Sequence, residues 1–241
     1  MTNIVAMVRT LNEEKNIGFW INAYAPWVDH VIVADGGSND ATVSIVRTSQ
    51  EIYPNVHLRF FMDIVWGKEG TWRNPEGKHI NFLLDWAAEL EADWVIFDDC
   101  DCRPNKFLKA NGRDLIEQEE TDFLLITRLY LWMGGKLHFE NLAQPAKRDV
   151  WEPSLWAWRL SSGLRADSSV DWDIGWNFRV DQEPLNALMP PYCLLHRPWP
   201  DRSAIRRKMK LYNNSYWADG EQRHFEYPRG RLANLPEWAE E

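Results

Sequence analysis

Short apolar runs alternate with amphipathic segments over the first hundred residues of the chain. The apolar runs are bounded by charged or turn residues, as expected of buried strands, and they occupy residues 3–8, 29–34, 56–61 and 94–97. Between them apolar positions recur at helical spacing, which predicts helices from residue 13 to about residue 27, at 42–52 and at 77–90. This alternation predicts an α/β protein with a mainly parallel sheet flanked by helices.

The pattern is looser beyond Asp101. It predicts a short helix at 113–120, strands at 123–132 and 151–160, and an amphipathic helix at 203–217. Residues 63–76 are rich in Trp, Gly and charge and are expected to form a loop. The sequence shows no internal repeat, so we expect one domain for most of the chain.

Composition narrows the class of protein. With 241 residues, of which 45% are hydrophobic, the chain is long enough for one sizeable core. No apolar run approaches the roughly 18 to 20 residues that span a bilayer, and no secretory signal pattern is present, so we expect a cytoplasmic protein. The three cysteines, Cys100, Cys102 and Cys193, lack C-x-x-C spacing, which argues against structural zinc or a disulfide framework and favours reduced thiols.

Charge and aromatic content bear on possible partners. The formal charge of -9 gives no general electrostatic reason to bind nucleic acid or an anionic membrane. Residues 201–210 are locally basic, and they either meet a phosphate-bearing ligand or form a solvated helix face. The 15 tryptophans offer flat apolar area that suits sugar faces as well as a protein core.

Three carboxylates follow the predicted strand at 94–97. Asp98, Asp99 and Asp101 lie within four positions, and charges this close raise one another's pKa values. A divalent cation bound by carboxylate oxygens would offset that repulsion. The sequence therefore favours an Asp-x-Asp metal site at the end of this strand, with a solvated polar turn as the alternative.

Polar turns also follow the first two strands. Residues 9–14 place Thr10, Asn12 and Glu13 after the first strand, with Asn12 as an expected helix N-cap. Residues 35–42 place glycines between the second strand and its helix, where the backbone allows close approach of a ligand. Nucleotides bind at such strand ends in open α/β sheets.

Three motifs, at residues 8–14, 33–42 and 94–101, resemble in order and spacing those of family 2 inverting glycosyltransferases with the GT-A fold. The resemblance covers residues 3 to 110. A fourth segment, Leu194-Leu195-His196-Arg197-Pro198 before a basic helix, is similar to the C-terminal part of small bacterial lipopolysaccharide-type members, in which this His approaches the metal and diphosphate.

The resemblance implies a single GT-A domain at residues 1–217, with a nucleotide-sugar-binding half at 1–110, an acceptor-side half at 111–200, a C-terminal helix at 201–217, and a tail at 218–241. It implies an enzyme that moves one sugar, with inversion, from a nucleotide-diphosphate sugar to an acceptor hydroxyl. The expected donor is a UDP-sugar, the cofactor is Mn²⁺ or Mg²⁺, and the acceptor is a glycan, a protein or another hydroxyl-bearing molecule.

The resemblance also implies roles for individual residues. The expected contacts to the nucleotide sugar come from the first-strand turn, the second-strand loop, the third helix and the Asp cluster: Thr10, Asn12, Glu13, Asp35, Gly36, Asp40, Lys78, Asn81, Asp98 and Asp99. Among these, Asp35 is expected to accept a hydrogen bond from an N–H of the nucleotide base, and Asp40 is expected to help fix the loop after the second strand. Lys78 stands where the family usually has Arg. The implied metal ligands are Asp99, Asp101 and His196.

Inversion also needs a base that takes the proton of the acceptor hydroxyl. The family's usual signature is absent, and the candidate carboxylates are Asp171, Asp173, Asp181 and Glu183. We favour Asp173, followed by Asp171, because flanking tryptophans would desolvate the carboxylate and raise its pKa.

Two other functions fit part of the pattern. A sugar nucleotidyltransferase also uses paired metal carboxylates, but it usually has a Gly-rich basic loop where this chain has residues 10–14. A catalytically silent sugar-binding module would use the tryptophans and would not need the base.

Overall fold

The first half of the protein is a parallel sheet. A computed structural model describes residues 1–62, 65–66, 72–73, 76–132, 136–138, 153–167, 175–176, 185–196 and 232–233. Within these residues, β1 (Ile4–Thr10), β2 (His30–Asp35), β3 (Val56–Phe60) and β6 (Trp94–Phe97) pair in parallel in the order β6-β1-β2-β3. Parallel neighbours point their carboxyl ends to one edge, so the polar turns that follow these strands meet there.

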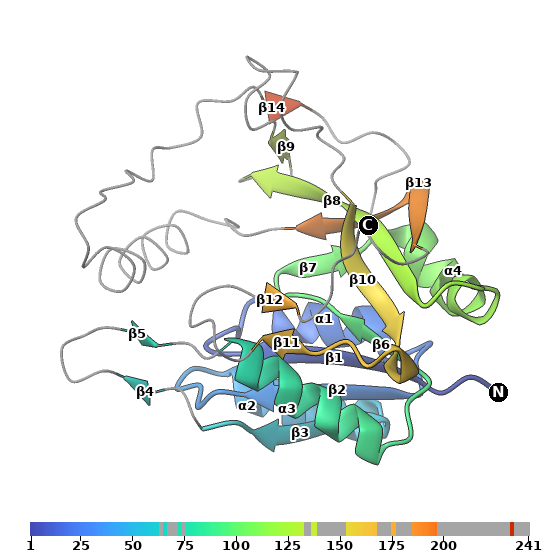
Figure 1. The fold of residues 1–241 in the computed structure, drawn as a ribbon. Coiled ribbons are helices and arrows are strands. Elements are labelled where there is room, and N and C mark those ends of the chain that lie inside the picture. The colour runs from blue at the N-terminus through green and yellow to red at the C-terminus, as the bar shows by residue number, and fades with distance from the viewer. Residues whose placement is uncertain are drawn as a thin grey trace, which may run out of the picture.

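Helices cover both faces of this sheet. The helices α1 (Ile17–Tyr24), α2 (Thr42–Ile52) and α4 (Lys106–Glu117) contribute to one apolar cluster, and α3 (Glu76–Glu89) packs into a second. Residues of β1 alternate between the two clusters, as the period of a strand requires. Figure 1 shows α3 crossing the near face of the parallel strands.

The second half extends the same sheet with mixed strand directions. β10 (Pro153–Arg159) lies antiparallel between β6 and β8 (Phe123–Trp132), and β13 (Leu185–His196) runs parallel to β8. The end of β13 pairs antiparallel with β7 (Cys102–Pro104). This pairing brings the end of β13 to the residues just after β6, as the ribbon view shows (Figure 1).

Short elements complete the described chain. β9 (Lys136–His138) pairs with β8 and with β14 (Leu232–Ala233), β4 (Val65–Trp66) pairs with β5 (Trp72–Arg73), and β11 (Ala166–Asp167) pairs with β12 (Gly175–Trp176). A single 3₁₀ turn, Leu160–Ser162, follows β10. None of the helices in these described segments is both long and apolar enough to cross a membrane.

The structure confirms the α/β class and the predicted strands and helices up to residue 97, together with the strands at 123–132 and 151–160, apart from the start of the first helix. The prediction of a helix at 113–120 was wrong in its start, because α4 begins at Lys106. Asn105 caps it by accepting a hydrogen bond from the Leu108 N–H (3.1 Å). The strands β7 and β13 were not predicted in full, and the helix at 203–217 lies outside the described residues.

Gly112 explains why the sequence pattern did not predict the first half of α4. Glycine weakens a helical pattern, so the segment reads as interrupted. In the structure a Cβ at this position would lie 2.8 Å from the Trp27 ring, closer than carbon atoms approach. Glycine therefore serves the close packing of α4 against the end of α1.

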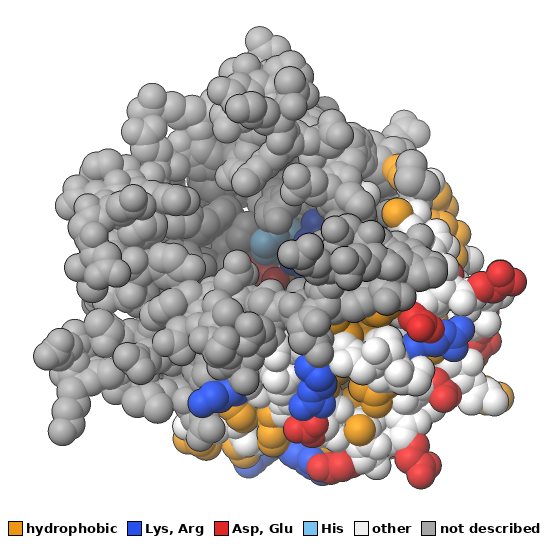
Figure 2. Space-filling model, in the orientation of Figure 1, with side chains coloured by type: hydrophobic (Ala, Val, Ile, Leu, Met, Phe, Trp, Pro, Cys, Tyr) orange, Lys and Arg blue, Asp and Glu red, His pale blue; other side chains and the backbone are white. Residues whose placement is uncertain are grey.

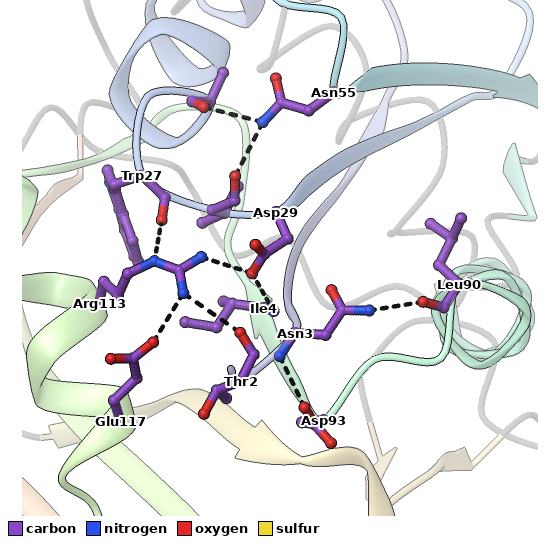
Figure 3. Close-up of polar contacts among 12 residues, drawn as sticks. Thr2, Asn3, Ile4, Trp27, Asp29, Asn55, Leu90, Asp93, Arg113 and Glu117 are labelled. Atoms are coloured by element: carbon purple, nitrogen blue, oxygen red, sulfur yellow. Dashed lines mark hydrogen bonds and ion pairs between the residues drawn. The ribbon is translucent and has the colours of Figure 1, made fainter.

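Arg113 hydrogen-bonds residues near the amino-terminal ends of β1 and β2, at the edge of the sheet opposite the candidate site (Figure 3). Its guanidinium donates to the Trp27 carbonyl (2.9 Å), to the Asp29 carboxylate (2.6 Å) and to Glu117 (2.9 Å). Asp29 in turn accepts from the Ile4 N–H (2.8 Å) at the start of β1. One side chain of α4 thereby fixes the entry to both β1 and β2.

We expect Arg113→Leu to lower the free energy of unfolding by about 2 kcal/mol, because the variant leaves the Asp29 carboxylate without its charged donor. Urea unfolding followed by circular dichroism measures this. Arg47→Leu, at an exposed position of α2, is the matched control and should change stability by less than about 0.5 kcal/mol. Equal stability of the two variants would contradict the role given to Arg113.

Candidate active site

Hydrogen bonds connect the turns after β1 and β2. The Asn12 N–H donates to Ser38 Oγ (2.8 Å), the Asn39 N–H donates to Asn12 Oδ1 (2.9 Å), and the Glu13 N–H donates to Thr42 Oγ1 (2.8 Å). The prediction that Asn12 caps a helix was wrong: α1 begins at Ile17, and Asn12 has a φ of 58°. This left-handed conformation lets Asn12 bridge the two turns, because Asn tolerates it better than most residues.

Asp35 organises the loop that follows β2. Its Oδ1 accepts from the N–H groups of Gly37 (2.9 Å) and Ser38 (2.8 Å), and its Oδ2 accepts from Thr10 Oγ1 (3.0 Å) and Ser38 Oγ (2.6 Å). The carboxylate is fully buried, and four accepted hydrogen bonds use its ordinary capacity. A hydrogen bond from a nucleotide base stays a prediction for Asp35, and it would require one of these donors to turn away.

Asp40 contributes further hydrogen bonds to the same loop. Its carboxylate accepts from the Thr42 N–H (2.9 Å) at the start of α2 and from the Glu14 N–H (3.2 Å). The Glu14 carboxylate accepts in return from the Ala41 N–H (3.2 Å). The loop is therefore held on both sides, and Gly36 at its start is buried and donates its N–H to the Thr10 carbonyl (2.9 Å).

Asp98, the first carboxylate after β6, is fully buried. The Tyr24 hydroxyl of α1 donates to its Oδ2 (2.8 Å) and itself accepts from the Trp156 indole of β10 (3.3 Å). Burial raises the pKa of Asp98 to about 6, against the opposing effect of Arg128, whose guanidinium lies 3.4 Å from Oδ1. Direct contact with a sugar stays a prediction for Asp98, whose oxygens face the protein interior.

Asp99 is the most exposed carboxylate of the cluster and lies between two arginines. Arg9 of β1 lies 3.7 Å from its Oδ1, and Arg128 of β8 lies 3.3 Å from its Oδ2. The Asp99 side chain is 34% exposed. It is thus the carboxylate of this group that a ligand reaches most easily, and the two arginines bring positive charge to the same place.

Asp101 and His196 meet at the end of the sheet. His196 Nε2 lies 3.2 Å from Asp101 Oδ1, and the Cys102 sulfur completes a group whose ligand atoms all lie within 4.8 Å of one another. The structure thus brings together two of the three predicted metal ligands, and it places Asp99 beside the arginines. The space-filling view shows histidine, acidic and basic side chains close together near the centre of the face (Figure 2).

The third helix supplies contacts of a different kind from those predicted. Asn81 donates to the Ala166 carbonyl (2.9 Å) and accepts from the Ala166 N–H (3.0 Å), so its amide holds β11 against α3. Lys78 is exposed in the first turn of α3. Between them, His79 is buried, contacts the Ala34 carbonyl at the end of β2 (3.1 Å) and stacks on Phe61 (4.6 Å between ring centres).

Several predicted functional residues lie outside the described residues. They are the four candidate bases, Asp171, Asp173, Asp181 and Glu183, and the basic residues between 201 and 210. The described strands on either side of the first two candidates are β11 and β12, which pair with each other. Asn81 therefore anchors the strand that leads into the segment with Asp171 and Asp173.

Four residues of the site were not predicted from the sequence. Arg9 and Tyr24 lie within the first predicted strand-turn and helix and were given no role, Arg128 lies within an apolar strand, and Cys102 was considered only for C-x-x-C spacing. Arg128 carried one detectable signal, because it is a lone charge in a predicted buried strand and such charges are usually paired. No local pattern links Tyr24 to Asp98 or Cys102 to His196, because each of these contacts joins elements that are far apart in the sequence.

The comparisons with known proteins rest on structure alone, because no family model and no curated protein sequence matches the chain. A structure of S. aureus TarS 1–349 in complex with UDP is similar with a TM-score of 0.55 and 17% identity, over 88% of this chain and 64% of that one. The chain spans 39% of the longer TarS structure.

A mannosyltransferase from Pyrobaculum calidifontis, PcManGT, solved in complex with GDP-Man and Mn²⁺, is similar with a TM-score of 0.52 and 16% identity, over 88% of this chain and 62% of that one. At this identity the likeness establishes the fold. The protein has the GT-A type of fold, with a central sheet flanked by helices.

We expect His79→Gln to reduce the loss of stability in acid. Burial lowers the pKa of His79 to about 3, so below the unfolded-state pKa of about 6.5 the unfolded chain binds a proton that the folded protein does not. The stability supplied by neutral His79 is complete above pH 6.5 and falls by about 1.4 kcal/mol per pH unit down to pH 3. Urea unfolding of both proteins at pH 7 and pH 5 measures the difference, and parallel losses would contradict it.

We expect Arg128→Leu to cost about 3 kcal/mol of unfolding free energy, because it leaves the buried Asp98 without its opposite charge. Adding Asp98→Asn to that variant should restore most of the loss, since the amide still accepts from Tyr24 and carries no charge. Denaturant unfolding of the two single variants and the double variant at pH 7.5 gives the coupling free energy between Arg128 and Asp98. Additive losses would contradict the pairing.

Proposed function

We propose that the protein is a metal-dependent inverting glycosyltransferase that moves one sugar from a nucleotide-diphosphate sugar to an acceptor hydroxyl. The observation that carries this is the convergence, in a GT-A fold, of the turns after β1 and β2 with Asp99, Asp101 and His196. The structures of similar fold contain UDP in TarS and GDP-Man with Mn²⁺ in PcManGT. We propose a UDP-sugar as the donor.

The nucleoside would bind along the connected turns. Thr10 ends β1, Asn12 and Glu13 follow it, and the loop with Gly36 follows β2, so the base and the ribose would lie against these turns. Hydrogen bonds between the two turns hold them in shape, which would reduce the ordering cost of binding. Asp35 and Asp40 would act by holding the loop in shape.

The diphosphate would face the Asp cluster. The Asp101 carboxylate oxygen is a ligand atom that suits Mn²⁺ or Mg²⁺, and the His196 nitrogen, 3.2 Å away, would be a second ligand of the same ion. A bound divalent ion supplies charge stabilisation for the leaving nucleotide diphosphate. Arg9 and Arg128 beside Asp99 would orient the donor phosphates and add positive charge at the same place.

The acceptor hydroxyl must lose a proton as the new glycosidic bond forms at the anomeric carbon. We propose Asp173 as the base, and Asp171 as the second candidate, because tryptophans on both sides would raise the pKa of such a carboxylate. The Asn81 contact to β11 would position the segment that carries them. The acceptor would meet the part of the chain between Leu131 and Leu195, whose tryptophans suit a glycan surface.

The test is donor turnover. We expect wild-type protein with Mn²⁺ to release UDP from UDP-glucose or UDP-N-acetylglucosamine, through slow transfer to water when no acceptor is added. Asp101→Asn should lower the rate about 100-fold or more, because it removes charge that stabilises the leaving group. Coupled detection of UDP measures the rate, and Asp114→Asn, at an exposed position of α4, is the matched control.

Two results would reject the proposal. Equal rates for wild-type protein and Asp101→Asn would show that the Asp101 carboxylate takes no part in the reaction. Release of pyrophosphate from UTP and a sugar 1-phosphate, without UDP release from the sugar nucleotide, would identify a nucleotidyltransferase. If turnover is found, Asp173→Asn should lower it while leaving UDP binding unchanged, and the same loss in Asp171→Asn alone would transfer the role of base to Asp171.

A further inference from the structure

Cys102 lies opposite His196 in the antiparallel pair formed by β7 and the end of β13. Residues directly opposite in such a pair project their side chains to the same face of the sheet. Asp101 precedes Cys102 in the tight turn closed by the hydrogen bond from the Cys102 N–H to the Asp99 carbonyl (2.8 Å). Backbone pairing thus brings an oxygen, a sulfur and a nitrogen ligand to one point.

The distances are close to those of a tetrahedral metal site. Bonds of about 2.0 to 2.3 Å to zinc place neighbouring ligand atoms roughly 3.3 to 3.7 Å apart. The Asp101 and His196 atoms are already 3.2 Å apart, and the Cys102 sulfur lies within 4.8 Å of both. A shift of the sulfur by about 1 Å would bring it to the distance expected of a third ligand.

The surroundings favour a bound cation. Asp98 and Asp99 add negative charge close to Cys102, and the Arg128 guanidinium offsets part of it. Cys102 and Asp101 are buried and His196 is partly exposed, so the three ligands are shielded while one side stays accessible. Three protein ligands with an open fourth position are typical of zinc sites at which a further molecule binds.

We propose that Asp101, Cys102 and His196 form a preformed site for a thiophilic divalent ion, Zn²⁺ in preference to Mn²⁺ or Mg²⁺, which binds before any nucleotide. Thiolate selects Zn²⁺ over the harder ions, whereas Asp101 and His196 alone do not. Binding replaces the S–H bond of Cys102 by a zinc–sulfur bond, and the proton leaves to the buffer. The inference rests on the proposed function only in that Asp101 and His196 are also the proposed ligands of the catalytic ion.

This selectivity has a consequence for the proposed enzyme. Zn²⁺ in this site would occupy Asp101 and His196, two of the ligands that the proposed catalytic ion needs. The Cys102 sulfur would make the affinity for Zn²⁺ higher than the affinity for Mn²⁺. The donor diphosphate would then meet an ion with fewer open positions. Micromolar Zn²⁺ would therefore compete with Mn²⁺.

The test uses Co²⁺ as a spectroscopic probe of the full-length protein without nucleotide. We expect one bound Co²⁺ with an intense near-ultraviolet sulfur-to-cobalt charge-transfer band, displaced by Zn²⁺. Cys102→Ser should abolish the band and weaken Zn²⁺ binding by more than the roughly 10- to 100-fold that loss of an outer-shell partner costs. Cys193→Ser, which removes another buried thiol, is the matched control and should keep the band.

A second measurement keeps the proposal testable if Cys102→Ser fails to fold. X-ray absorption of wild-type protein loaded with one Zn²⁺ should show a single sulfur at about 2.3 Å. Only oxygen and nitrogen ligands, or a band that survives in folded Cys102→Ser, would overturn the proposal. Because neither readout involves sugar transfer, a protein with the band but no donor turnover would reject the proposed function alone, and turnover without the band would reject this inference alone.

Discussion

Three carboxylates within four residues at the end of β6 set the main electrostatic constraint on this protein. Such crowding is unfavourable unless other elements supply compensating groups. These groups come from three strands and one helix: Arg9 on β1, Arg128 on β8, His196 on β13 and Tyr24 on α1. The second half of the chain is therefore needed to stabilise the end of the first. The site and the mixed sheet that continues beyond β6 depend on each other.

The environments of the three carboxylates differ although their sequence positions are almost equivalent. Asp98 points into the interior, where burial raises its pKa, and it joins α1 and β10 through Tyr24 and Trp156. Asp99 lies partly exposed between two arginines, and Asp101 meets His196. One motif thus supplies an internal polar link, an accessible carboxylate and a candidate metal ligand, and the difference arises from which element packs against each.

The turns after β1 and β2 were well suited to prediction. A polar stretch after an apolar run, followed by a helical pattern, identifies a strand end, and parallel pairing places such ends at one edge. The details were harder to obtain. Asn12 looked like a helix cap, but its left-handed backbone and its contacts with Ser38 and Asn39 are set by a loop 26 residues away. The first half of α4 was not predicted because Gly112 interrupts the helical pattern. A glycine is needed there to make room for the Trp27 ring, which the sequence pattern does not reveal.

The sequence by itself determined the alternation of strands and helices, the mainly parallel character of the first sheet and the clustering of Asp98, Asp99 and Asp101, because periodicity and local charge are properties of neighbouring residues. Only the tertiary structure decided what surrounds those carboxylates. Arg128 follows them by about thirty positions, and His196 by almost one hundred, so no local pattern links them. Strand pairing does, and it is the pairing of β7 with β13 that sets Cys102 beside His196.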